Sequence, residues 1–257
     1  MSTTIELTVI GVAAMLTSIL SAVAGLGGGV ILLLVIAQFV APTTAIPIQG
    51  AIQLVSNGSR AGLLRRDIAW PVVGWSSILV LPGSALGVLI ATSLPQDAIR
   101  VVLATFVLVL AWRPGWLKPR AAGTVPVADP AHSPSSGRRT MLLGLGAASG
   151  LLNTTVGASG PVTSPFYRAV TASRVAFVAT AATTQVSAHA AKLIAFASDG
   201  WSADDHTATI AVGIVGVAIG SRVGTSLLGR ISTTHLDLLF RVVLTALAAR
   251  LLVTAVL

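Results

Sequence analysis

Two runs of polar side chains recur at helical spacing inside otherwise apolar sequence. They consist of Gln49, Gln53 and Asn57 in the first half of the chain, and of Gln185, His189 and Lys192 in the second. Intervals of three and four residues place side chains along one face of a helix. Amide, imidazole and ammonium groups on such a face can donate several hydrogen bonds to one ligand. These runs therefore predict the binding of a polar or negatively charged solute.

A glycine cluster precedes each of these runs. The clusters contain Gly27, Gly28 and Gly29 in the first half, and Gly157, Ser159 and Gly160 in the second. Each glycine in a helix interior costs about 1 kcal/mol relative to alanine, and irregular backbone within a bilayer is tolerated only where it is buried in protein or lines a cavity. We therefore predict a broken helix at each cluster. A helix that restarts there exposes backbone N–H groups and the positive end of its dipole, which favour an anion.

Further hydrogen-bonding groups surround the second cluster. They are Asn153, Thr154 and Thr155. No acidic residue accompanies these side chains, so we expect no metal site built from carboxylates and no cofactor. Other roles remain open for parts of the set. Glycines allow close helix packing and amides join helices by hydrogen bonds, and Lys192 can extend along its helix towards the membrane surface.

The composition of the chain indicates the environment of these side chains. Of its 257 residues, 54% are hydrophobic and only 9% are charged. Soluble domains carry about 25% charged residues, so we predict a polytopic protein embedded in the lipid bilayer. The net charge of +8 comes from basic residues in short loops between apolar runs, which is typical of cytoplasmic loops and does not indicate nucleic-acid binding. The absence of cysteine excludes disulfides and thiolate chemistry.

The apolar segments form two sets of five. The first set covers approximately residues 5–24, 28–41, 44–63, 69–92 and 97–113, and the second 140–155, 160–172, 174–198, 206–229 and 235–256. A polar, proline-containing stretch separates the sets and predicts a flexible linker. The expected organisation is a first transmembrane repeat over 1–113, a cytoplasmic linker over 114–139 and a second transmembrane repeat over 140–257.

Residues at corresponding positions indicate that the two sets are repeats. Gln53, Asn57 and Arg60 match Gln185, His189 and Lys192, and Gly83, Ser84 and Gly87 match Gly220, Ser221 and Gly224. One such match carries little weight, but several in the same order are difficult to attribute to chance. Weak internal symmetry of this kind is common among secondary transporters, where interrupted helices in the two halves mark the binding site.

Loop charge predicts that the repeats are inverted. Arg60, Arg65 and Arg66 follow the third segment of the first half, whereas Asp199, Asp204 and Asp205 follow that of the second. Basic residues accumulate on the cytoplasmic side, so equivalent loops lie on opposite sides of the membrane. The expected fold is an all-α polytopic membrane protein with two inverted repeats of about five helical segments each, giving 8–10 spans. The linker lies in the cytoplasm and both termini lie outside.

The glycine clusters and the second polar run resemble those of the TauE/SafE family of membrane permeases. The resemblance rests on Leu26 to Gly29, on Gly157 to Pro161, and on Ala179, Thr180, Gln185, His189 and Lys192. It implies export of sulfite or a small organosulfonate across the bacterial inner membrane. Two positions depart from the family pattern. The first cluster continues as Val30-Ile31-Leu32 without a following proline, and Ala158 and Ser159 replace glycine in the second.

The function that we predict is transport of a small anion by alternating access at a site near the middle of the membrane. His189 is a candidate for coupling transport to protons, because histidine exchanges a proton near pH 6.5. Two other functions remain open. Ser159 and His189 are the pair that a rhomboid-like intramembrane serine protease uses, and a passive anion channel has the same sequence features. The chain can act as a monomer or as a homo-oligomer.

Overall fold

A computed structural model describes residues 3–24, 27–112, 135–227 and 234–256. Within these ranges the regular elements are eleven α-helices and two short 3-10 helices. The first half contains α1 (Thr3–Ala24), α2 (Gly28–Ile36), α3 (Pro42–Leu63), η1 (Arg65–Asp67), α4 (Trp70–Ser77), α5 (Val80–Ser93) and α6 (Gln96–Trp112). The second contains α7 (Ser136–Thr155), α8 (Gly160–Ala169), α9 (Arg174–Ser198), η3 (Asp204–His206), α10 (Thr207–Leu227) and α11 (Thr234–Val256).

The described part of the chain is all-helical, as predicted. The predicted linker lies outside the described residues as far as residue 134. Helix α7 begins at Ser136, within the range predicted for the linker.

Two described helices are long and apolar enough to cross a bilayer by themselves. They cover Thr3–Val23 and Asp204–Leu227. A third candidate is the pair formed by α4 and α5, which bend by 44° at the break between them. Pro82 explains this bend, because proline lacks the N–H that would bond the carbonyl of Ile78 and its ring collides with that carbonyl. Buried polar side chains lower the mean hydropathy of α3 and α9, which pack against protein.

The most extensive helix packing joins the two halves of the chain. Helix α1 packs along α10, and α5 packs along α7. At each seam glycines allow backbones to touch: an added Cβ on Gly220 would lie 2.3 Å from the carbonyl oxygen of Met15, and one on Gly83 would lie 2.3 Å from that of Ala147. Small residues permit this close approach, which is a main source of helix association in membranes.

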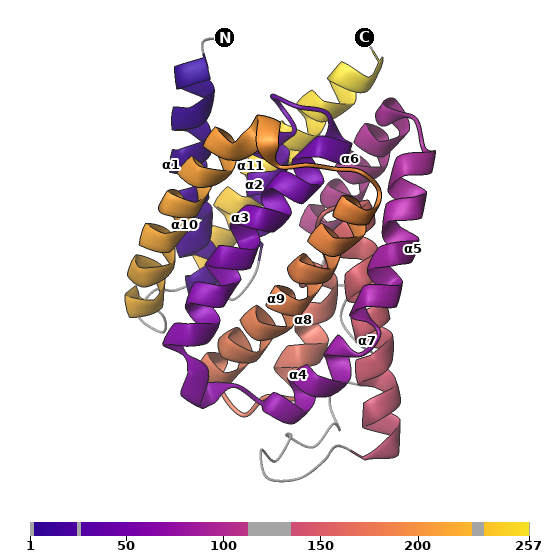
Figure 1. Cartoon of the computed structure of the whole chain (residues 1–257). Helices are drawn as coiled ribbons and strands as arrows, with labels where there is room; N and C mark the ends of the chain where they lie inside the picture. The colour runs from indigo at the N-terminus through magenta and orange to yellow at the C-terminus, as the bar shows by residue number, and fades with distance from the viewer. Residues whose placement is uncertain (1–2, 25–26, 113–134, 228–233, 257) are drawn as a thin grey trace.

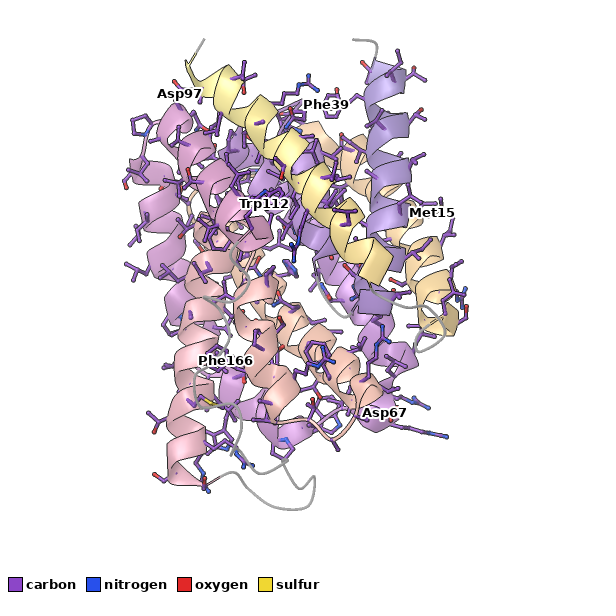
Figure 2. The ribbon with its side chains drawn as sticks, turned by 180° about the vertical axis from the view of Figure 1, so that it is seen from behind. Met15, Phe39, Asp67, Asp97, Trp112 and Phe166 are labelled. Carbon is purple, nitrogen blue, oxygen red and sulfur yellow. The ribbon has the colours of Figure 1, made fainter. Side chains whose placement is uncertain are left out.

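Helices α3 and α9 lie side by side at the centre of the bundle, with α10 packed on α3 and with α4 and α5 packed on α9 (Figure 1). Helix α2 is almost wholly buried, packs against α1, α3 and α11, and contributes Leu32, Leu33 and Leu34 to the largest apolar core. Both chain termini lie at one end of the bundle (Figure 1). Figure 2 shows Phe39 and Asp97 at this end and Asp67 at the other.

Candidate functional site

The two short helices begin at the predicted glycine breaks. Helix α2 begins at Gly28 and α8 at Gly160, which confirms a restart of the helix at each cluster. Gly27 has φ of 106° and Gly157 has φ of 68°. Residues with a Cβ rarely adopt this left-handed region, so glycine is needed at both positions. An added Cβ on Gly157 would also lie 2.3 Å from Cδ2 of Leu33, which fixes how closely the second break approaches α2.

A cavity lies between these helix starts and the polar faces of α3 and α9. Its volume is about 40 Å³. A cavity needs about 10–15 Å³ on this measure to hold one water molecule, so this one has room for a few waters or an ion of a few non-hydrogen atoms. The predicted residues that line it are Gly27, Gly29, Gln49, Gln53, Asn57, Asn153, Gly157, Ser159, Gly160, Gln185 and His189.

The remaining predicted residues lie outside the cavity lining, and helix packing accounts for two of them. An added Cβ on Gly28 would lie 1.9 Å from the carbonyl oxygen of Thr17, so Gly28 lets α2 pack against α1. Thr155 donates a hydrogen bond of 3.3 Å to the carbonyl oxygen of Gly87 and so joins α7 to α5. Thr154 is fully buried beside the same glycine.

Lys192, the fourth of these residues, is fully buried at 0% exposure and does not extend to the membrane surface. Its Nζ donates a hydrogen bond of 2.9 Å to Oε1 of Gln49 on α3. Nε2 of Gln49 in turn donates to the carbonyl oxygen of Gly29 at 3.1 Å. Lys192 therefore positions the side chain of Gln49, which supports the start of α2. Gln49 lines the cavity, and Lys192 contacts it from outside the lining.

Hydrogen bonds tie the second break to α9. Nε2 of Gln185 donates to Oγ of Ser159 at 3.1 Å, and Nδ2 of Asn153 donates to Oε1 of Gln185 at 3.2 Å. The hydroxyls of Ser159 and Ser149 are 2.9 Å apart. Among the described residues, no hydrogen bond joins Ser159 to His189, so the two do not form the pair expected of a serine protease.

Arg60 also lines the cavity, although the sequence analysis did not include it in the site. Its side chain lies in the last turn of α3 and is only 2% exposed. Nη2 donates a hydrogen bond of 3.1 Å to Oγ of Ser56. The spacing of Arg60, three residues after Asn57 on the same helix face, is the signal that identifies it. Ser21, Val30, Ala158 and Pro161 complete the lining.

Several buried polar atoms around the cavity have no hydrogen-bond partner within the described protein. They include Nε2 of Gln53, Nε of Arg60 and Nδ1 of His189. Buried polar groups are nearly always satisfied, so a cluster of such atoms calls for a ligand or water. The cavity lining contains no Asp or Glu, and no group of three His, Asp or Glu residues within the described ranges could hold a metal ion. Oδ1 of Asn153 is an unpaired acceptor in the same lining. Nε2 of Gln53 and Nε of Arg60 can only donate, so these two groups fit a solute that carries acceptors.

The helical bundle and its buried, polar, carboxylate-free cavity are features of a membrane transporter. The family comparison agrees with this class. The chain belongs to the sulfite exporter TauE/SafE family, whose model matches residues 10–251. The members of this family are polytopic membrane transporters and not enzymes, so the protease alternative is wrong. Searches of the curated proteins and of the solved structures found no match.

Proposed function

We propose that this transporter carries a small oxyanion of the sulfite or organosulfonate class, and that the cavity between α2 and α8 is its binding site. The observation that carries the proposal is the charge of the lining. Arg60, His189 and the starts of two helices face one cavity, whose lining contains no carboxylate. Cationic side chains and helix N-termini bind anions by charge-assisted hydrogen bonds.

The size of the cavity and the burial of its side chains favour a compact anion carried by alternating access. A volume of about 40 Å³ suits sulfite better than a longer organosulfonate. Gln53, Asn57 and Ser159 are buried although they line the cavity. An open channel would leave such side chains in contact with water, so their burial supports a carrier. Saturable flux of sulfite in proteoliposomes separates a carrier from a channel.

The test is thermal unfolding of the purified protein with sulfite, sulfate, sulfoacetate, taurine, phosphate and acetate. A ligand that binds only the folded state stabilises it by about 2.7 kcal/mol at a hundredfold excess over its dissociation constant. We expect the largest rise in Tm with sulfite and a smaller one with sulfoacetate. If taurine, which is zwitterionic, stabilised the protein more than any anion, the proposed substrate class would be wrong.

We also propose that the two halves are inverted repeats, each of about five helical segments. The packing supports this symmetry because α1 against α10 and α7 against α5 are equivalent pairs. Gly220 and Gly83, which contact backbone at these seams, occupy matching positions in the two halves of the sequence. Helices α3 and α9, which carry the matched polar runs, pack against each other. This is the arrangement expected if a pseudo-two-fold axis between them relates the two repeats.

The proposed orientation puts both termini outside the bacterial inner membrane. Arg65 and Arg66 lie at one end of the bundle, beside Asp67, and the connection between α9 and α10, with its acidic residues, lies at the end that holds the termini (Figures 1 and 2). The chain has no cysteine, so single cysteines can be introduced. In intact cells, an impermeant maleimide should label Asp205→Cys and leave Asp67→Cys unlabelled until the membrane is opened. If Asp67→Cys were labelled in intact cells and Asp205→Cys were not, the proposed orientation would be wrong.

We further propose that His189 couples anion transport to protons. Its imidazole lines the cavity and its Nδ1 has no partner within the described protein. A proton on the imidazole and an anion in the cavity stabilise each other by charge attraction, so the two bind together. We expect sulfite flux in proteoliposomes to respond to an imposed pH gradient, and His189→Gln to lose this response while still binding sulfite. An unchanged response in the variant would exclude His189 as the coupling residue.

A further inference from the structure

Three buried serines from three helices form a hydroxyl cluster next to the cavity. They are Ser18 on α1, Ser56 on α3 and Ser221 on α10. The hydroxyl oxygens of Ser18 and Ser221 are 2.8 Å apart, those of Ser18 and Ser56 are 3.0 Å apart, and those of Ser56 and Ser221 are 3.5 Å apart. The cluster joins helices of both halves at the seam where α10 packs against α1.

Arg60 contacts this cluster as a hydrogen-bond donor. Arginine only donates, so the hydroxyl of Ser56 accepts from Nη2 of Arg60 and must donate its own proton elsewhere. Ser18 is the nearest hydroxyl acceptor, and Ser18 can pass its own hydrogen bond to the carbonyl oxygen of Val217 at 3.2 Å. Ser221 can donate to the carbonyl oxygen of Ser56 at 3.3 Å. In this arrangement every hydroxyl of the cluster has an acceptor, and Arg60 is the first donor in the series of hydrogen bonds.

We propose that Ser56 is a positioning residue, which holds the guanidinium of Arg60 against the anion, and that Ser18 and Ser221 orient Ser56 for this task. The inference rests on the proposed function, in which Arg60 binds the transported anion. An arginine side chain has many rotamers, and fixing it before the ligand arrives reduces the entropy lost on binding. With the hydroxyl of Ser56 removed, Arg60 would keep its charge but lose the contact that orients its guanidinium.

Simple adhesion between helices is the competing explanation, since serines often join membrane helices by hydrogen bonds. Ser84 on α5 provides a matched control. It corresponds to Ser221 in the other half, is fully buried, and its hydroxyl has no partner within the described protein. Ser84→Ala therefore removes a buried hydroxyl that does not contact Arg60, and we expect it to leave sulfite affinity unchanged.

The experiment is a double-mutant cycle on sulfite affinity, measured by calorimetry on the purified full-length protein at constant pH. The cost of ordering one long side chain on binding predicts that Ser56→Ala weakens sulfite binding by up to about tenfold. In the Arg60→Gln background, Ser56→Ala should cause no further loss, because the group that it positions is gone. Equal losses in both backgrounds would mean that Ser56 acts through general stability, and would overturn the inference.

Two further outcomes separate this inference from the proposed function. If Arg60→Gln weakens binding and Ser56→Ala does not, the positioning role is wrong and the anion site stands. If Arg60→Gln itself leaves sulfite affinity unchanged, the proposed role of Arg60 in the anion site is wrong.

Should Ser56→Ala fail to fold, Ser18→Ala carries the same test. It removes the hydroxyl that is nearest to that of Ser56 and is not a hydrogen-bond partner of Arg60, and we expect a loss of about threefold that disappears in the Arg60→Gln background. An unchanged affinity in Ser18→Ala would overturn the inference.

Discussion

Replacing Arg60 with glutamine is expected to weaken sulfite binding by about 10- to 100-fold. A hydrogen bond to a charged group contributes about 1.5–3 kcal/mol, and each 1.4 kcal/mol changes affinity tenfold. Arg60 is buried and lines the cavity, and its Nε has no partner among the described residues, so it can offer the anion both a charge and a donor. The measurement is the dissociation constant of sulfite, together with the rise in Tm at saturating sulfite.

The ligand-free Arg60→Gln protein should be at least as stable as the wild type. A buried cation without a carboxylate partner is costly, so its removal offsets the loss of the hydrogen bond to Ser56. Arg66, which is exposed in η1 and outside the cavity, is the matched control. Arg66→Gln should leave the affinity unchanged. Equal weakening in both variants would show that long-range charge, and not contact with the anion, controls binding.

The second large effect is expected from Gly146→Ala, which should lower the free energy of unfolding by about 3 kcal/mol. The added Cβ would lie 2.0 Å from the carbonyl oxygen of Ser76, far inside van der Waals contact. Overpacking typically costs about 1–3 kcal/mol, and a backbone carbonyl within a helix yields less than a side chain does. The measurement is Tm and the yield of folded protein after extraction in mild detergent.

Gly144 lies two residues earlier on the same helix and provides the control. It is exposed, and an added Cβ there meets no atom within 4 Å. Gly144→Ala should therefore be neutral or should stabilise the protein by up to about 1 kcal/mol through helix propensity. If both variants unfolded at the wild-type temperature, the close contact between α7 and α4 would be wrong.

The helix breaks could be predicted from the sequence because clustered glycine is costly within apolar sequence. Residues 22–29 and 155–161 carry this signal, and α2 and α8 begin at Gly28 and Gly160. The polar faces of α3 and α9 could be predicted for a similar reason. Intervals of four residues bring Gln49, Gln53 and Asn57 onto one helix face whatever surrounds it.

Other features depend on tertiary contacts that no local pattern encodes. Arg60 comes shortly before Arg65 and Arg66, so loop charge assigned it to the cytoplasmic flank, but α3 continues to Leu63 and buries it. Thr155 follows the donor-rich stretch of α7 but faces α5, and the sequence does not define this rotation of the helix. Lys192 bonds Gln49 on α3, a partner 143 residues away along the chain.

The glycine seams also limit which parts of the transporter can move against each other. Each seam joins a helix of one half to a helix of the other, with backbones in direct contact, so sliding at a seam would separate its most closely packed atoms. The helices held together by these seams are α1 with α10 and α5 with α7. Helices α3 and α9, whose polar faces line the cavity, pack against each other and against these pairs. A motion that kept both seams intact would therefore not separate the first half of the sequence from the second, and each moving body would contain helices from both halves.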